Sequence, residues 1–308
     1  MSELNAVNEY GVRILSLNGG GARGMFTISL LAEFERILAL KQPDQDIKIG
    51  DYFDLITGTS IGGILALGLA KGKSARELER VFYDKANDIF PKRWWLFNLL
   101  KSLVAPIYSS TPLRQTIEMM IGDETTFNDL TRRVMIPAVN LSTGKPQFFK
   151  TPHNPDFTRD GPLKLIDAAL ATSAAPTFFA PHRSEDLGAY FADGGLVANN
   201  PSYIGLLEVF QDMKSDFPDV THKDIHILNI GTTGEEYSLR EGANKQVISS
   251  QADSLVKISR IWADFFPQTH RISLFRLFFP PFLALFPVFT EISPTDVSFG
   301  PPRTGWPG

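Results

Sequence analysis

The strongest chemical signal in the sequence is a serine enclosed by glycines, in Gly58-Thr59-Ser60-Ile61-Gly62. Apolar segments precede and follow this G-x-S-x-G pattern, which predicts a sharp turn from a strand into a helix. In such a turn the neighbours of the serine almost touch, so glycine is needed at both Gly58 and Gly62. The serine then lies at a helix N-terminus, whose N–H groups favour developing negative charge. We interpret Ser60 as a nucleophile; a turn that only permits tight packing is the alternative.

A second glycine-rich segment, Gly19-Gly20-Gly21-Ala22-Arg23-Gly24, lies between an apolar run and a helical run. Consecutive glycines can turn their N–H groups inward and hold the oxyanion of a tetrahedral intermediate. The first three glycines are therefore candidates for an oxyanion hole, and Arg23 can fix the loop or meet an anionic head group. The segment also satisfies G-x-G-x-x-G, the fingerprint of dinucleotide-binding oxidoreductases. That alternative is weak, because the next strand ends in Thr57-Gly58-Thr59-Ser60 and not in an acidic residue.

Asp193 is the candidate base for this serine, since it follows a short apolar strand and precedes Gly194 and Gly195. A carboxylate beside two glycines can approach another loop closely, because no bulky side chain intervenes. Taken alone, such a sequence is usually only a turn. The serine turn and the glycine-rich loop give it weight, and we predict a two-residue device of Ser60 and Asp193.

A serine–histidine–aspartate triad is the alternative, because three histidines follow Asp193 in the order found in α/β-hydrolases. His226 alternates within a buried strand, His222 lies in a polar turn, and His270 lies in a segment without helix or strand period. An α/β-hydrolase nucleophile also normally follows several strands, whereas Ser60 follows one complete strand–helix unit. We favour the dyad and keep a triad esterase as the alternative.

Periodic hydrophobic patterns predict the elements that must position these residues. Strands are expected over 12–17, 54–57, 133–140, 147–150, 190–192 and 225–230, and helices over 26–40, 64–70, 74–90 and 163–170. Ser74 and Glu77 have the spacing of a capping box, and Thr111, followed by Pro112, is predicted as the N-cap of one more helix. Short apolar strands that alternate with helices imply a mostly parallel sheet covered on both faces. We predict an α/β fold of three layers, α/β/α. One domain is expected over 12–240, followed by a C-terminal segment, 241–308, whose structure the sequence does not predict.

GGGARG, GTSIGG and DGG, in this order, resemble the motifs of the patatin-like phospholipase family. The resemblance covers residues 12–233. It implies that Ser60 attacks an ester carbonyl, that Asp193 acts as general base, and that the glycine-rich loop supplies the oxyanion hole. It further implies hydrolysis of fatty acyl esters of membrane phospholipids, of the phospholipase A type, without a catalytic cofactor.

The segments FNDL, VNLSTGKPQFFKTPHNP and GEEYSL narrow this resemblance to bacterial patatin-like effectors of anti-phage defence that cyclic nucleotides activate. A cyclic dinucleotide is therefore the activator that the resemblance implies. No nucleotide-binding motif of its own is visible in the sequence.

Composition limits the remaining classes of function. The chain has 308 residues and a net charge of −4, which argues against binding to a nucleic acid polymer. It contains no cysteine, which excludes disulfides, thiolate catalysis and cysteine-rich metal sites, and we expect no metal. The N-terminal residues show no secretory signal, and no segment reaches the roughly 20 apolar residues of a membrane span. We expect a cytoplasmic protein that acts at the inner face of the membrane; the sequence leaves a homo-oligomer open.

Contact with the membrane is expected at residues 91–106, PKRWWLFNLLKSLVAP. Trp94, Trp95 and Phe97 stand among lysine and arginine residues, a combination that suits the interface of an anionic bilayer. A helix packed on the domain is the alternative.

Overall fold

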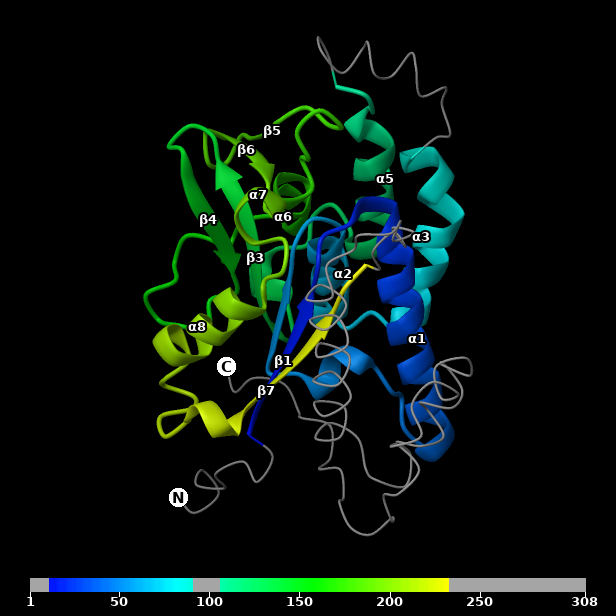
Figure 1. The fold of residues 1–308 in the computed structure, drawn as a ribbon, viewed down its shortest axis with the longest axis vertical. Coiled ribbons are helices and arrows are strands. Elements are labelled where there is room, and N and C mark those ends of the chain that lie inside the picture. The colour runs from blue at the N-terminus through cyan, green and yellow to red at the C-terminus, as the bar shows by residue number, and fades with distance from the viewer. Residues whose placement is uncertain (1–10, 91–105, 233–308) are drawn as a thin grey trace, which may run out of the picture. The chain divides into compact units, whose positions relative to one another are not determined.

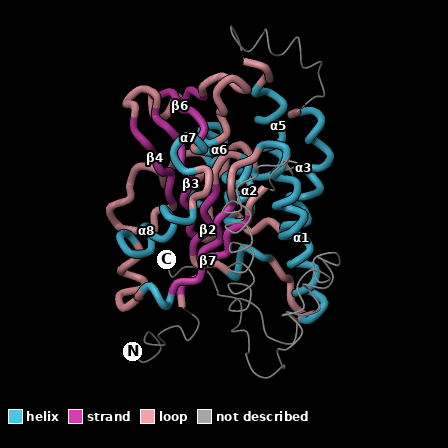
Figure 2. The backbone as a smooth tube through the Cα atoms, in the orientation of Figure 1, coloured by secondary structure: helices cyan, strands magenta, loops and turns pink. Residues whose placement is uncertain are grey.

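The computed structural model describes residues 11–90 and 106–232, and all structural statements concern this part of the chain. Its elements are shown in Figures 1 and 2. The strands are β1 (Val12–Leu17), β2 (Leu55–Gly58), β3 (Arg133–Asn140), β4 (Lys145–Lys150), β5 (His182–Ser184), β6 (Ala189–Asp193) and β7 (Ile225–Ile230). The α-helices are α1 (Gly24–Lys41), α2 (Ile61–Ala70), α3 (Ala75–Ile89), α5 (Ser110–Ile121), α6 (Leu165–Thr172), α7 (Gly195–Ala198) and α8 (Ser202–Asp212). Short 3-10 helices are η1 (Gly21–Arg23), η2 (Ile49–Tyr52), η3 (Phe127–Asp129) and η4 (His222–Asp224).

The seven strands form one sheet in the order β5-β6-β3-β2-β1-β7, and β4 pairs with β3. β7, β1, β2 and β3 are parallel, whereas β4 and β6 run antiparallel to β3, and β5 antiparallel to β6. The predicted α/β fold is confirmed, with a sheet that is mixed rather than mostly parallel. The reason lies in the connections: a turn containing Gly144 joins β3 to β4, and a parallel pair would need a crossover of about a dozen residues.

β2 and β6 share one edge of β3 and meet end to end there. Met135 of β3 pairs with Thr57 of β2, Ala138 of β3 pairs with Asp193 of β6, and β4 pairs with β3 along this whole length. Since β4 occupies one edge, β2 and β6 both lie on the other. β2 runs parallel to β3 and β6 runs antiparallel to it, so their carboxyl ends point toward each other across a short gap.

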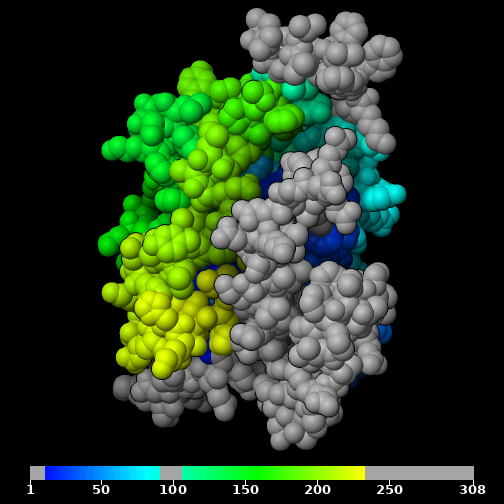
Figure 3. All heavy atoms as spheres, viewed as in Figure 1, coloured from blue at the N-terminus to red at the C-terminus, as the bar shows by residue number. Residues whose placement is uncertain are grey.

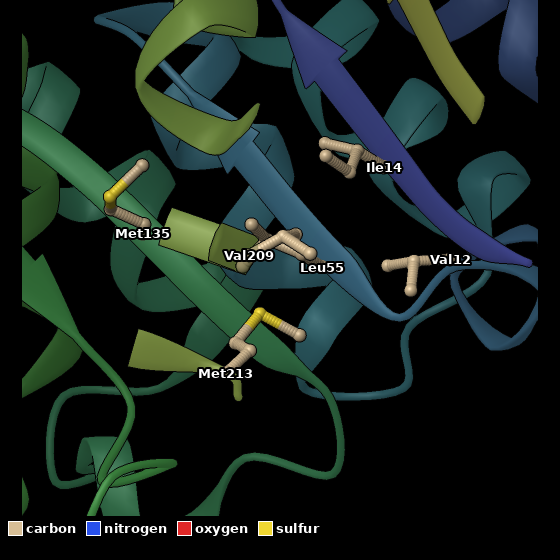
Figure 4. Close-up of a cluster of buried hydrophobic side chains, with 6 residues drawn as sticks. All are labelled: Val12, Ile14, Leu55, Met135, Val209 and Met213. Carbon is tan, nitrogen blue, oxygen red and sulfur yellow. The ribbon is translucent and has the colours of Figure 1, made fainter. Parts of the chain in front are cut away.

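Helices cover both faces of this sheet. On one face, α8 packs on β1 and β2, and a cluster of buried side chains fills the contact (Figure 4): Val12, Ile14, Leu55, Met135, Val209 and Met213. α2 packs against β1, β2 and β3, and all ten of its residues are buried, as its uniformly apolar sequence predicts. α1, α3, α5 and α6 each contact α2. In Figure 3, the atoms coloured green to yellow, from β3 to β7, lie on the left of the face turned to the viewer.

The two predicted helix starts have different outcomes. Ser74 and Glu77 form the expected capping box, because each side chain accepts the N–H of the other residue, at 3.1 and 2.9 Å. The prediction of Thr111 as an N-cap is wrong by two positions. The cap is Ser109, whose hydroxyl accepts the Thr111 N–H at 3.2 Å, so that the helix begins at Ser110.

Candidate active site

Ser60 lies in the turn between β2 and α2 and is the N-cap residue of α2. Its backbone angles, φ 55° and ψ −124°, lie in a region that costs a non-glycine residue roughly 1–3 kcal/mol. A Cβ atom on Gly58 would overlap the carbonyl oxygen of Gly62, and one on Gly62 would overlap that of Leu17. The turn therefore has the strained geometry that the sequence predicts, and the serine it presents is half-buried.

Asp193 ends β6 and is 5% exposed. The Gly195 N–H donates a hydrogen bond to its Oδ1 at 2.6 Å, and the Ser60 hydroxyl lies near enough to favour the ionised carboxylate. The end-to-end arrangement of β2 and β6 thus brings the predicted nucleophile and base close together, although some 130 positions of chain separate them.

The pKa of the Asp193 carboxyl is raised above its ordinary value, chiefly because burial disfavours the charged form. The Ser60 hydroxyl and the Gly195 N–H act in the opposite direction and only partly offset burial. A carboxylate with a raised pKa is a stronger base than one in water, which suits it to accept a proton from a serine.

Thr172, the last residue of α6, fixes both strand ends and was not identified from the sequence. Its fully buried hydroxyl accepts the Ser60 N–H at 3.0 Å and donates to the Pro137 carbonyl at 2.7 Å. Its own carbonyl accepts the Gly194 N–H at 3.1 Å. Thr172 therefore fills the gap on β3 between the end of β2 and the end of β6. A threonine among small apolar residues carries no sequence signal for such a role.

The glycine-rich loop lies against the serine. A Cβ atom on Gly19 would lie 3.4 Å from Cβ of Ser60 and would overlap the side-chain oxygen of Asn199. The Gly19 N–H donates to the Asn199 carbonyl at 3.0 Å, and the Arg23 N–H donates to the Gly20 carbonyl at 3.2 Å. Within the described part of the chain, the N–H groups of Gly20 and Gly21 have no acceptor. These two amides directly follow Gly19, the residue of the loop that approaches Ser60, and are candidate donors to a ligand oxygen.

A polar network at the carboxyl ends of β1 and β7 holds this loop. The side-chain amide of Asn229 lies 2.9 Å from Oδ1 of Asn18 and 2.7 Å from Oδ1 of Asn200. The Thr232 hydroxyl donates to the Gly19 carbonyl at 3.1 Å. Residues from β7, from the segment after α7 and from the loop itself therefore form one connected structure.

The described histidines have other partners. His153 is buried between Thr151 and Glu208, at 2.9 and 2.8 Å, and His182 contacts Asp167 at 2.7 Å. The His222 ring packs on Phe210, with ring centroids 4.6 Å apart, and His226 pairs with Arg13 across β1 and β7. Within residues 11–90 and 106–232, no histidine contacts Ser60 or Asp193. The geometry therefore favours the dyad over a triad built from these residues.

Several predictions fall on residues that the structure does not describe, namely Trp94, Trp95, Phe97 and His270. In the described ranges no group of three or more histidine, aspartate or glutamate side chains could hold a metal ion. No described helix is both long and apolar enough to cross a membrane.

A strained serine on a strand–helix turn, close to a buried aspartate and to a glycine-rich loop on an α/β scaffold, is typical of the serine hydrolase class. The family model described as patatin-like phospholipase matches residues 15–204. The chain belongs to the patatin-like phospholipase family, as its three glycine-containing motifs predict. This assignment replaces the dinucleotide-binding alternative for the glycine-rich loop.

Three relatives share the name cGAMP-activated phospholipase. One from Escherichia coli is 83% identical over 239 residues, which cover 78% of this chain and 67% of the relative. One from Vibrio cholerae is 68% identical over 234 residues, which cover 74% of this chain and 66% of the relative. One from Pseudomonas aeruginosa is 43% identical over 232 residues, which cover 75% of this chain and 65% of the relative. The match thus spans about two thirds of the length of each relative.

Proposed function

We propose that this protein hydrolyses fatty acyl esters of membrane phospholipids, with Ser60 as nucleophile and Asp193 as general base. The observation that carries the proposal is the proximity of these two side chains at the meeting point of β2 and β6. Membership of the patatin-like phospholipase family supplies the substrate class.

The first half of the reaction acylates the enzyme. The Ser60 hydroxyl transfers its proton to the Asp193 carboxylate while its oxygen attacks the ester carbonyl carbon. The carbonyl electrons move onto oxygen and form a tetrahedral oxyanion. When the intermediate collapses, the bond to the leaving alcohol breaks, and that alcohol takes the proton from Asp193. A lysophospholipid departs and the acyl group stays on Ser60.

The second half returns the enzyme to its starting state. A water molecule gives a proton to Asp193 and attacks the acyl-enzyme. The bond to the serine oxygen breaks, and Ser60 recovers the proton from Asp193 as the free fatty acid leaves. One carboxylate thus serves as base and acid in turn, which requires its pKa to lie nearer neutrality than that of an exposed aspartate. Burial shifts the Asp193 pKa in that direction.

The oxyanion is assigned to the N–H groups of Gly20 and Gly21. The Gly19 N–H already donates to the Asn199 carbonyl and is not counted as an oxyanion donor. Because Gly19 has no side chain, the loop can approach Ser60 closely. Each oxyanion donor contributes roughly 3–4 kcal/mol in comparable sites. The N-terminus of α2, where Ser60 occupies the N-cap position, adds a favourable dipole.

A cyclic dinucleotide such as cGAMP is proposed as the activator, because the three relatives carry that activator in their names. The setting that the sequence resemblance implies, bacterial defence against phage by lipid degradation at the inner face of the membrane, belongs to the same proposal.

The test is fatty acid release from phospholipid vesicles by the full chain, with and without cGAMP. We expect cGAMP to raise the rate for the wild type and Ser60→Ala to abolish release in both conditions. Release that persists in Ser60→Ala would refute the assigned nucleophile, and equal wild-type rates with and without cGAMP would refute the activator.

A further inference from the structure

The side-chain amide of Asn199, the residue directly after α7, lies beside both members of the proposed pair. A Cβ atom on Gly19 would overlap Oδ1 of Asn199 and would lie 3.4 Å from Cβ of Ser60. A Cβ atom on Gly195 would lie 3.3 Å from the same asparagine oxygen and 2.9 Å from Oδ1 of Asp193. The Asn199 oxygen is therefore close to the serine on one side and to the aspartate on the other.

Two hydrogen bonds fix the backbone at this asparagine against the elements that carry the site. The Thr59 hydroxyl donates to the Ala198 carbonyl at 2.6 Å, and the Gly19 N–H donates to the Asn199 carbonyl at 3.0 Å. Thr59 is fully buried and immediately precedes the proposed nucleophile. The fold therefore determines where the Asn199 side chain begins, relative to both the serine turn and the glycine-rich loop.

The fold itself does not use the side chain of Asn199. In the part of the chain that the structure describes, this side chain makes no hydrogen bond, and the residue is exposed to solvent. The next residue differs, because Oδ1 of Asn200 accepts the Ser202 N–H at 3.0 Å and the Asn229 amide at 2.7 Å. The first of the two adjacent asparagines thus has a polar group that is open to a reactant.

The type of atom decides which reactant fits. Oδ1 of Asn199 and the carboxylate of Asp193 are both hydrogen-bond acceptors. An oxyanion needs donors, so it gains nothing from a second acceptor beside the carboxylate. A water molecule has two O–H groups and can donate one to each. Water is also the nucleophile in the second half of the proposed reaction.

We propose that Asn199 is a catalytic residue for deacylation, whose Oδ1 accepts one O–H of the attacking water while the other proton passes to Asp193. The inference rests on the proposed function, which supplies the acyl-enzyme. The water oxygen bonds to the acyl carbon, the bond from that carbon to Oγ of Ser60 breaks, and Ser60 takes the proton back from Asp193. Asn199 gives up no proton; it orients the water toward the acyl carbon. Acylation consumes no water, so Asn199 acts only in the second half.

The test is competition between water and methanol for the acyl-enzyme formed from p-nitrophenyl butyrate, using the full chain with cGAMP present. Methanol has one O–H, which it gives to Asp193, and has none left for Asn199. The ratio of methyl butyrate to butyrate compares the two attacks directly, whichever step limits the overall rate. We expect this ratio to rise by about tenfold in Asn199→Ala, because water loses one hydrogen bond that methanol never makes.

Two further variants separate this role from a structural one. Asn199→Asp retains an acceptor oxygen and should keep the product ratio close to that of the wild type. Asn128→Ala is the matched control, because Asn128 is also exposed and its Oδ1 also lies against a glycine, 2.6 Å from where a Cβ atom on Gly161 would be. It should leave the ratio unchanged. A disturbance of the fold alone would slow both attacks alike and would not move the ratio.

The failure of this inference and that of the proposed function are distinguishable. The inference alone is overturned if Asn199→Ala has the wild-type ratio, if Asn128→Ala raises the ratio equally, or if Asn199→Asp behaves like the alanine variant. If the wild type does not hydrolyse the ester, or if hydrolysis persists in Ser60→Ala, the proposed function and the inference fail together.

Discussion

At the residue scale, the reactivity of Ser60 and Asp193 depends on their surroundings. Aspartate in water is a poor base for a serine hydroxyl because its pKa is low, about 3.9. Asp193 is almost wholly buried, and burial raises its pKa while the Ser60 hydroxyl and one backbone N–H keep the ionised form accessible. In the proposed mechanism, the strained backbone of Ser60 positions its hydroxyl, and burial makes the Asp193 carboxylate more basic.

The raised pKa of Asp193 makes a pH prediction with a definite sign. Only the ionised carboxylate accepts the serine proton, so kcat/KM for a soluble ester should fall as the pH decreases through the pKa of Asp193 in the folded protein. Because burial raises this pKa, we expect the midpoint above the ordinary aspartate value of about 3.9. A pH–rate profile measures it; a midpoint at or below that value contradicts the assignment.

The same shift predicts how Asp193→Asn affects stability. The pKa of the Asp193 carboxyl is higher in the folded protein than in the unfolded chain, so ionisation of Asp193 destabilises the fold. The free energy of unfolding therefore falls as the pH rises from the unfolded-state pKa to the folded-state pKa. The asparagine side chain of this variant keeps an oxygen that can accept the Gly195 N–H, but it carries no charge. At neutral pH we expect an unfolding temperature equal to or above that of the wild type, with activity lower by roughly 10²–10⁴-fold.

Calorimetry and ester hydrolysis on the same samples check this pair of effects. Asp219→Asn, at an exposed position distant in sequence from the site, is the control and should change neither quantity. A large loss of stability in Asp193→Asn would show that the carboxylate of Asp193 stabilises the fold, which contradicts a buried charge that destabilises it.

At the element scale, the site exists because β2 and β6 end opposite each other on one edge of β3. The hydrophobic patterns of the sequence predicted β2 and β6, and the three glycine motifs predicted Ser60, Asp193 and the loop beside them. The pairing of two strands with a shared third strand could not be predicted, because it depends on register and direction and not on local pattern. Thr172 and Asn229 were missed for the same reason, since their contacts join segments far apart in the chain.

Thr172 offers a test of this arrangement. Thr172→Val keeps the shape but removes the hydroxyl, which leaves the buried Ser60 N–H without its acceptor and the Pro137 carbonyl without its donor. Unpaired buried groups of this kind cost roughly 1–3 kcal/mol. We expect a matching loss in the free energy of unfolding by urea, and a fall in kcat/KM of at least tenfold.

Thr172→Ser separates the hydroxyl from the rest of the side chain. It retains the hydrogen-bonding oxygen and should recover most of the activity that Thr172→Val loses. Equal activity in the valine and serine variants would mean that the hydroxyl does not position Ser60.

At the scale of the whole molecule, a patatin-like phospholipase must reach a substrate that lies in a membrane. The described residues supply the proposed Ser60–Asp193 pair and the glycine-rich loop that approaches Ser60. From the sequence alone we expect residues 91–106, with their paired tryptophans and basic residues, to bind the bilayer surface.

The double variant Trp94→Ala/Trp95→Ala tests that expectation. It should weaken binding to anionic vesicles in a sedimentation assay by about tenfold or more, because tryptophan favours the membrane interface. Hydrolysis of a soluble ester should change far less. Equal losses in vesicle binding and soluble-ester hydrolysis would assign these residues to the fold of the domain and not to the membrane.

The central claim is that Ser60 is activated by Asp193 without a histidine, and the rate and site of fluorophosphonate labelling test it most directly. We expect the probe to modify Ser60, as identified by peptide mass spectrometry, and the labelling rate to fall by roughly 10²–10⁴-fold in Asp193→Asn. The rate should be unchanged in His222→Ala and His270→Ala. Modification of another residue, or a labelling rate that depends on either histidine and not on Asp193, would contradict the account.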